Sequence, residues 1–230
     1  MTRIAGLSWD DIESRLAAGA PAILPIGAGA KEHGLHLPMN TDEIQAMWLA
    51  DALAAETGAL VWPVIAYGYY PAFREFPGSI TLSQPLFVSL VRDISMEILR
   101  WKPQRLFVLN TGISTLGPVD EALAGLDGAV HLRIHDGPGY RAAAAALAQQ
   151  AFGSHADELE TSRMLVIAPD AVRMPRAAAS PGGAFQGALT RANAPSGSYG
   201  DPAHATFDKG RALLDAMLDD LREAMKILPA

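Results

Sequence analysis

The sequence contains no cysteine, which excludes disulfide bonds and thiolate metal ligands. Its 230 residues include 18 lysines and arginines against 25 aspartates and glutamates, so the formal net charge is −7. This shortage of basic residues argues against a nucleic-acid-binding surface, which is usually positively charged. Long apolar runs are also missing, because breaks such as Pro63 interrupt them, and no membrane span is expected. A metal site would therefore use histidine, aspartate and glutamate, which suit zinc, manganese or iron.

Short apolar segments alternate with segments of helical length along the whole chain. The expected strands cover 22–26, 59–66, 105–109 and 129–134. The expected helices cover 8–19, 41–58, 85–101, 140–152, 158–167 and 208–226. Such alternation is typical of a mainly parallel sheet with helices on both faces. The sequence therefore predicts a three-layer α/β/α fold, formed as a single domain over residues 1–230.

Three loops follow expected strands, after Ile26, Ala66 and Leu109. Ligands of open α/β sheets bind at the carboxyl ends of strands, so these loops are the expected site. The Gly-, Pro-, Ala- and Ser-rich stretch 177–203 is too long for a plain connection. We expect it to form a lid, a wall of the site or an oligomer contact. The first residues show no signal-peptide pattern, so a cytoplasmic location is expected.

The loop after Ile26 concentrates ionisable side chains. Within twelve residues it holds Lys31, Glu32, His33, His36 and Asp42. Asp42 is expected at the start of a helix, where the helix dipole keeps a carboxylate ionised, as a metal ligand must be. The spacing alone leaves two alternatives open: a metal site, or a helix-capping aspartate beside two hydrogen-bonded loop histidines.

Four segments resemble the motifs of the creatininase family of amidohydrolases. They are Leu24-Pro25-Ile26-Gly27 with Glu32-His33-Gly34-Leu35-His36-Leu37-Pro38 and Thr41-Asp42, then Phe76-Pro77-Gly78-Ser79-Ile80, then His155-Ala156-Asp157-Glu158-Leu159-Glu160-Thr161-Ser162, and finally Gly200-Asp201-Pro202 with Lys209-Gly210. They occur in the family's order and cover nearly the whole chain. The resemblance implies a creatininase-like α/β/α fold and a hydrolase that depends on divalent metal.

The resemblance also implies roles for individual residues. Family members typically bind two metals bridged by one aspartate, which Asp42 resembles by position. His33 and Glu160 are similar to the ligands that complete the shell of one metal. His155 resembles a histidine beside the substrate that acts as a general acid or base, and Glu160 is counted with it in the catalytic group. Glu32 is a further candidate ligand, because one extra residue after Gly27 is what a backbone bulge adds.

Two departures from the family pattern affect the second metal. Lys31 stands where the family has an acidic residue, and Gly112 stands where a metal-binding histidine is usual. We therefore predict one well-formed metal site. Ser114 is a candidate substrate-binding residue, although the plain reading is a Gly-Ser-Thr turn. His36 and Tyr70 are further candidates, the latter within an aromatic loop that equally suits packing.

The predicted function is metal-dependent hydrolysis of a non-peptide C–N bond in a small amide, cyclic amide or formamide. The resemblance implies a small-molecule substrate and a homo-oligomer, a hexamer or trimer. Two alternatives stay open: a metal-poor protein that binds a small molecule without hydrolysing it, and another metal-assisted reaction such as lactone opening.

Overall fold

The computed structural model describes residues 2–181 and 189–226, and the part of the expected lid or wall at 182–188 lies outside these ranges. Its sheet consists of β1 (Ala22–Ile26), β2 (Leu60–Val61), β3 (Leu106–Asn110) and β4 (Ala129–Arg133). The strands lie in the order β2-β1-β3-β4, and every pairing is parallel. The predicted α/β class with a mainly parallel sheet is confirmed. The single-domain arrangement stays a prediction.

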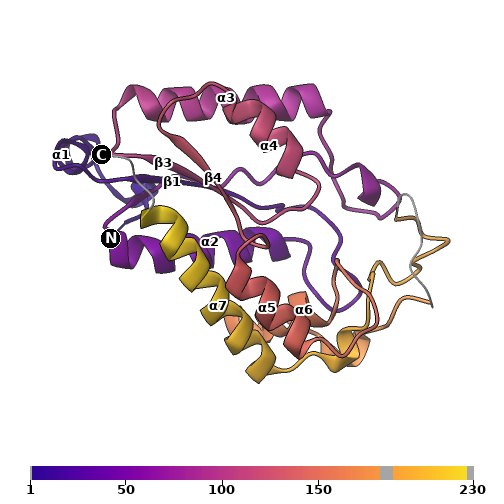
Figure 1. Ribbon diagram of the computed structural model, residues 1–230. Helices are drawn as coiled ribbons and strands as arrows, with labels where there is room; N and C mark the ends of the chain where they lie inside the picture. Colours follow the sequence, from indigo (N-terminus) through magenta and orange to yellow (C-terminus); the bar gives the residue numbers. More distant parts are fainter. Residues whose placement is uncertain (1, 182–188, 227–230) are drawn as a thin grey trace.

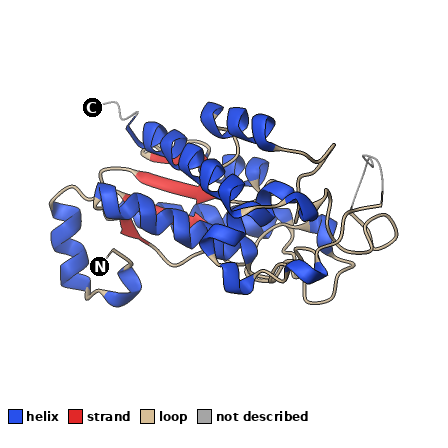
Figure 2. Ribbon diagram, turned by 90° about the horizontal axis from the view of Figure 1, so that it is seen from below, coloured by secondary structure: helices blue, strands red, loops and turns tan. Residues whose placement is uncertain are grey.

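Helices cover both faces of this sheet. They are α1 (Trp9–Ala17), α2 (Thr41–Thr57), α3 (Gln84–Arg100), α4 (Leu116–Leu123), α5 (Pro138–Leu147), α6 (Glu158–Ile167) and α7 (Phe207–Lys226), with short 3₁₀ turns at Ile4–Gly6, Pro71–Phe73, Pro169–Ala171, Met174–Arg176 and Pro202–His204. Figure 1 shows α3 and α4 on one side of the strands, and α2, α5, α6 and α7 on the other. Figure 2, which views the molecule from below, shows helices lying across the strands of the sheet. Within the described ranges, none of the helices has the length and apolarity needed to cross a bilayer.

Alternating strand residues supply the two halves of the core. Ile23 and Phe107 pack with residues of α2 and α7, whereas Leu24 and Val108 pack with residues of α3 and α4. Successive side chains of a strand point to opposite faces, so each strand contributes to both halves. This explains why the central strands read as continuous apolar runs, as expected for a sheet covered on both sides.

Local sequence signals set several helix ends. Ser8 and Asp11 form the expected capping box at the start of α1. Gly58 ends α2 in the left-handed conformation, with a φ of 71° that glycine adopts without strain. Strand β2 is shorter than the predicted 59–66, because only Ile65 of its second half pairs with β1. Helix α4 was not predicted, since it is short and starts inside the turn after β3.

Helix α7 fixes the position of α6, which follows the expected His155 motif. Gly210 of α7 lies directly against the backbone of Ser162, and a methyl group there would come within 2.6 Å of the Ser162 carbonyl carbon. Hydrogen at this position is therefore what lets the two helices approach each other. The buried carboxylate of Glu158 at the start of α6 also pairs with Lys209 of α7.

We expect Gly210→Ala to destabilise the fold by about 1–3 kcal/mol, because overpacking forces backbone shifts. Gly117→Ala in α4 is the matched control, since nothing lies within 4 Å of the added methyl group. Alanine is favoured over glycine in helices, so the control should be neutral or slightly stabilising. Urea denaturation of both variants measures the difference, and equal stabilities would contradict the close packing of α6 on α7.

Candidate metal centre

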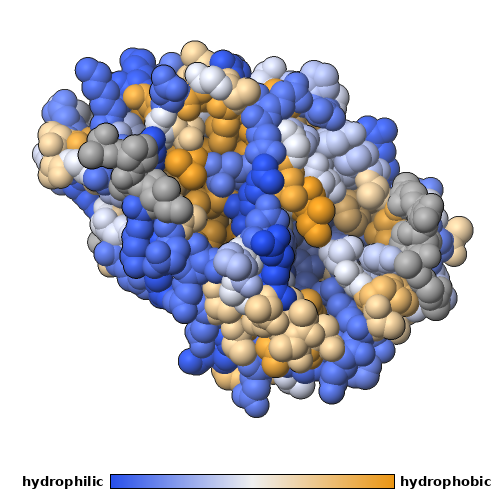
Figure 3. All heavy atoms as spheres, in the orientation of Figure 1, coloured by the Kyte–Doolittle hydropathy of each residue, from blue (hydrophilic) through white to orange (hydrophobic). Residues whose placement is uncertain are grey.

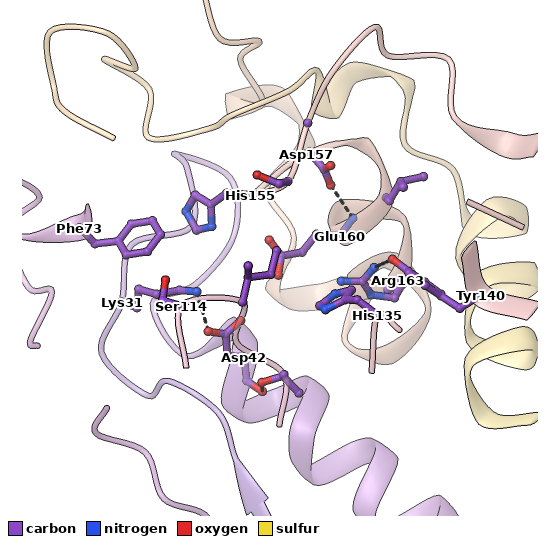
Figure 4. Close-up of a pocket in the computed structure, with 15 residues that line it drawn as sticks. Lys31, Asp42, Phe73, Ser114, His135, Tyr140, His155, Asp157, Glu160 and Arg163 are labelled. Carbon is purple, nitrogen blue, oxygen red and sulfur yellow. Dashed lines mark hydrogen bonds and ion pairs between the residues drawn. The ribbon is translucent and has the colours of Figure 1, made fainter. Parts of the chain in front are cut away.

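A cavity of about 320 Å³ opens at the carboxyl end of the sheet. Residues from three strand-end loops and from α6 line it, among them Lys31, Asp42, Ser114, His135, Glu160 and Arg163. Figure 4 shows these side chains converging from different elements on one space. The cavity lies where the sequence placed the site, at the ends of β1 and β3.

Gly27 brings the start of α2 against the end of β1. A methyl group on Gly27 would lie 2.7 Å from the carbonyl carbon of Asp42. Thr111, just after β3, donates its hydroxyl hydrogen toward the carbonyl oxygens of Ile26, at 3.1 Å, and Asp42, at 3.3 Å. The first turn of α2 is therefore tied to two neighbouring strands, and Asp42 projects from a rigid position.

The Asp42 carboxylate is buried between two cationic or potentially cationic groups. Its Oδ2 lies 2.7 Å from the Lys31 ammonium, and its Oδ1 lies 3.1 Å from His33 Nε2. Burial alone raises the pKa of Asp42, but Lys31 and His33 outweigh it and hold that pKa well below its usual range. The contact with Lys31 is a short ion pair at Oδ2, between two buried side chains. Asp42 is thus an ionised carboxylate that can bind a cation.

His33 presents one defined ring nitrogen to the carboxylates. Its Nδ1 lies 2.9 Å from the carbonyl oxygen of Lys31, which only accepts, so Nδ1 carries the proton. Its Nε2 faces Asp42 Oδ1 at 3.1 Å and Glu160 Oε1 at 4.0 Å. With the proton of the neutral ring on Nδ1, Nε2 presents its lone pair to the space between the two carboxylates, where a metal ion could bind. This is the tautomer and setting of a metal-ligating histidine.

Glu160 is held in place by both of its oxygens. Oε2 accepts from the Ala156 amide at 2.8 Å, and Oε1 accepts from Gln45 Nε2 at 3.1 Å. Ala156 has a φ of 46°, a left-handed conformation that is costly outside glycine and typical of functional sites. Burial raises the pKa of Glu160, but the opposing effect of His33 is decisive and lowers it to about 2. The carboxylate is therefore ionised at neutral pH.

His155 completes the cluster and is supported by Glu32. Ligand atoms of His33, His155 and Glu160 all lie within 4.8 Å of one another, close enough to hold one ion. Glu32 Oε1 lies 2.7 Å from His155 Nε2, and its Oε2 accepts from the Gly34 amide at 2.8 Å. Gly34 and His155 thus engage both oxygens of Glu32. The expected role of Glu32 as a ligand stays a prediction.

Part of the long 177–203 stretch packs against two residues of the site, Glu32 and His155. Tyr199 donates its amide hydrogen to the His155 carbonyl at 2.8 Å, and the two residues form a short antiparallel bridge. Gly197 has a φ of 81°, and an added methyl group there would overlap the Glu32 carboxylate. These contacts fix the Glu32–His155 pair from outside. Whether the stretch acts as a lid, a wall or an oligomer contact stays a prediction.

Two of the three expected substrate-binding residues do not line the cavity. His36 is buried with its Nε2 2.8 Å from the Thr161 hydroxyl, and burial lowers its pKa to about 4, so it is a neutral structural group. Tyr70 is 2% exposed, and its ring lies under the Lys31 ammonium at 5.5 Å. His36 was proposed from the first family motif and Tyr70 from the aromatic loop, and both side chains are buried in the structure. Ser114 does line the cavity, as expected.

The turn after β3 offers no imidazole to a second ion. The Asn110 side-chain oxygen accepts from the Gly112 amide at 3.1 Å and from the Thr115 hydroxyl at 2.8 Å. A methyl group on Gly112 would lie 2.7 Å from that same hydroxyl. The turn is closed by its own hydrogen bonds. Its conformation therefore suits glycine at position 112, where the family usually has a metal-binding histidine.

Several cavity residues escaped the sequence analysis. Arg163, His135 and Tyr140 line the cavity on the side away from Lys31 (Figure 4). Arg163 follows Glu160 by three residues, and residues at this spacing share one face of a helix. The three-residue spacing from Glu160 was therefore the feature of the sequence that indicated a position for Arg163 at the cavity. Tyr140 gave no comparable signal, because its approach depends on how α5 packs. His135, just after β4, lies near the missing ligand in the sequence, but its expected strand setting gave no reason to include it.

We expect Glu32→Gln to lower turnover while leaving metal content unchanged, because the Glu32 carboxylate contacts His155 and orients its ring. Loss of an orienting carboxylate of this kind typically costs about 10–100-fold. Glu97→Gln, which removes a surface carboxylate paired with Arg100, is the matched control. Metal analysis and steady-state kinetics on both variants separate the effects. A Glu32→Gln protein that loses its metal would instead make Glu32 a ligand.

Nearly the whole chain matches one protein family. Residues 5–225 match the family model described as creatininase, creatinine amidohydrolase. The creatinine amidohydrolase of Pseudomonas putida is 28% identical and matches over 97% of this chain and 95% of its own. A mycofactocin precursor peptide peptidase of Mycobacterium ulcerans is 31% identical over 90% of this chain and 85% of its own.

Solved structures agree with the sequence relatives. Creatininase with manganese, a zinc–zinc creatininase variant and a variant in complex with creatine superpose with TM-scores of 0.87, 0.86 and 0.84. Each is 26% identical and matches over 98% of this chain and 97% of its own. The expected creatininase-like fold is confirmed.

Proposed function

Because the chain belongs to the creatininase family, we propose that it is a metal-dependent amidohydrolase acting on a non-peptide C–N bond of a small amide, cyclic amide or formamide. The grouping of His33, His155 and Glu160, whose ligand atoms all lie within 4.8 Å of one another, with Asp42 beside His33, carries this proposal. Either a proton on His33 or a metal ion would stabilise an imidazole that faces two ionised carboxylates, and the manganese and zinc of the creatininase structures favour the ion. The donor set of nitrogen and carboxylate oxygens suits zinc or manganese.

The residues of the site have different roles in the proposed reaction. His33, Asp42 and Glu160 hold the ion, which when bound polarises a carbonyl group and lowers the pKa of a water. His155 moves a proton at its ring nitrogen and delivers it to the leaving nitrogen of the amide. Glu32, 2.7 Å from His155, fixes the tautomer and orientation of that ring. The buried setting strengthens each of these electrostatic effects.

Lys31 supports a centre with one ion rather than two. Its ammonium lies 2.7 Å from Asp42 Oδ2, where a bridging aspartate would otherwise contact a second ion. The carboxylates of Glu32, Asp42 and Glu160 and the ammonium of Lys31 leave a formal charge of −2 when the imidazoles are neutral. One divalent ion neutralises this group, and a second would leave a buried excess of positive charge.

The cavity volume favours a small substrate. At about 320 Å³ the cavity lies at the lower end of the range for small-molecule sites. The peptide peptidase named among the relatives makes a peptide the second candidate substrate. Lactone opening and binding without hydrolysis remain the competing activities. A screen of lactams, formamides, lactones and short peptides with added zinc or manganese distinguishes them.

We expect about one tightly bound divalent ion per chain, measured by mass spectrometry of the metal after purification without chelator. His33→Ala should remove both metal and activity, because His33 is part of a small ligand shell. His155→Ala should keep the metal but lower turnover by about 10²–10⁴, as for a general acid or base. His204→Ala, at an exposed histidine, is the control.

Three outcomes would count against this proposal. Two ions per chain would contradict the role given to Lys31. Loss of metal in His155→Ala would make His155 a ligand rather than a proton carrier. Absence of hydrolysis from every metal-loaded preparation would favour the binding protein.

A homo-oligomer is part of the proposal, with a hexamer or trimer as the expected size. Trp9 and Trp101 are 76% and 57% exposed and line an apolar groove of about 570 Å³ together with Trp62. Exposed aromatic surface of this kind is typical of interaction sites. Figure 3 shows a further apolar area over the alanine-rich α5, among polar neighbours. A cytoplasmic location stays a prediction, which cell fractionation would test.

Light scattering on the purified protein should show the oligomer, and Trp101→Asp should reduce its size if the groove is the contact. Asp93→Asn, at a residue lining a neighbouring hollow, is the control. A wild-type protein that is monomeric at micromolar concentration would contradict the proposal.

A further inference from the structure

Arg163 is a buried cation at the wall of the cavity. Its residue is 2% exposed, and it lines the same space as Lys31 and Glu160. The guanidinium is charged at every physiological pH. A buried charge is costly unless it is paired, so the partners of Arg163 decide what this residue does.

The protein satisfies only part of the guanidinium. Nε donates to Gln45 Oε1 at 2.8 Å, and one terminal nitrogen donates to the Tyr140 hydroxyl at 2.6 Å. Arginine carries five N–H donors, and these two bonds are both to uncharged groups. Among residues 2–181 and 189–226, no carboxylate oxygen lies within the 4.0 Å of an ion pair with Arg163.

The carboxylates nearby have other partners. Both oxygens of Glu160 accept hydrogen bonds, from Gln45 and Ala156, and its ionised form faces His33. Asp157 caps the start of α6 by accepting from the Glu160 amide at 2.9 Å, and its other oxygen accepts from Gln150 at 2.7 Å. Neither of these carboxylates is placed to neutralise the guanidinium directly.

The groups around Arg163 leave it as the local positive charge. Burial raises the pKa of Tyr140, so its hydroxyl stays neutral and retains a hydrogen to donate. Burial, followed by the charge of Arg163, lowers the pKa of His135 to about 4, so that ring is neutral at pH 7. Figure 4 shows Arg163, Tyr140 and His135 gathered on one side of the cavity, with Glu160 between them and His155.

We propose that Arg163 binds a carboxylate group of the substrate, so that the preferred substrates are small amides, lactams or formamides that carry a negative charge. This deepens the proposed hydrolase function and rests on it. Planar, forked guanidinium groups match carboxylates bidentately, and such charge-assisted pairs are strong in a buried setting. The Gln45 amide bridges Arg163 and Glu160, so the anion-binding group lies one side chain from the metal centre.

Two matched pairs of probes test the proposal: 5-oxoproline with 2-pyrrolidinone, and N-formylglycine with N-methylformamide. Each pair differs by one carboxylate. We expect the charged member to bind the wild-type protein about 10–100-fold more tightly in titration calorimetry, as for hydrogen bonds to a charged group. Arg163→Met should abolish this preference, and Arg163→Lys should keep part of it, since a lysine retains the charge without the fork.

Arg163 also ties α6 to α2 and α5, so each variant is first compared with wild type by thermal unfolding. Arg92→Met removes an arginine of α3 that bonds backbone carbonyls and should leave the preference unchanged. Repeating the titrations on metal-free protein separates Arg163 from a direct carboxylate–metal bond, because Arg163 acts without the ion. A preference that disappears with the metal overturns the proposal.

The proposal is also overturned if wild-type protein binds both members of a pair equally, or binds neither. An unchanged preference in a folded Arg163→Met or Arg163→Lys protein would overturn it as well. These results leave the hydrolase function intact if neutral amides are still turned over. Failure of the hydrolase function would appear differently, as a charge preference in binding without hydrolysis of any probe by the metal-loaded enzyme.

Discussion

The structure depends on bringing buried carboxylates together beside Lys31, whose ammonium pairs directly with Asp42. Asp42 starts α2 and Glu160 lies in the first turn of α6, so the positive ends of two helices favour both negative charges. His33 lies between them with its Nδ1 proton committed to a backbone carbonyl. Gln45 and the Ala156 amide hold Glu160 in the same way from neighbouring elements. The site is therefore rigid before any ion binds, which reduces the free energy needed to organise it.

The aromatic loop after β2 makes the buried lysine possible. Lys31 is only 6% exposed, and its ammonium lies 4.9 Å from the Phe73 ring and 5.5 Å from the Tyr70 ring. Ring faces attract cations and offset part of the cost of removing the ammonium from water. Tyr70 was expected to contact substrate, but its ring serves the lysine instead. Phe73 also packs on His155 at 4.5 Å between ring centres, so one side chain positions both the ammonium and the proton carrier.

The sequence could predict the parts of the site that depend on short stretches of chain. The layers followed from alternating strands and helices, and His33 and Asp42 followed from one loop and one helix start. Glu160 and His155 came from resemblance, because 113 residues separate His155 from Asp42 and spacing says nothing about such pairs. The position of Glu32 could not be predicted, since its direction depends on Gly197, a residue of the long stretch that closes over it. The inward turn of His36 could not be predicted either, because it follows from the hydrogen bond between His36 and Thr161.

The register of α6 connects the reaction to the choice of substrate. Glu160 and Arg163 are three residues apart, so any rotation of α6 that moves the metal-binding carboxylate moves the guanidinium with it. Gln45 of α2 contacts both side chains, its amide hydrogen on Glu160 and its oxygen on Arg163, and fixes their separation from a second helix. An amide that reaches the ion with its carbonyl thus meets a positive group at a set distance on the same wall. A substrate of the wrong length would satisfy one contact and leave the other buried group without a partner, which is the costly state. The geometry that keeps Glu160 in place therefore also sets how far the negative charge of a substrate lies from its scissile bond.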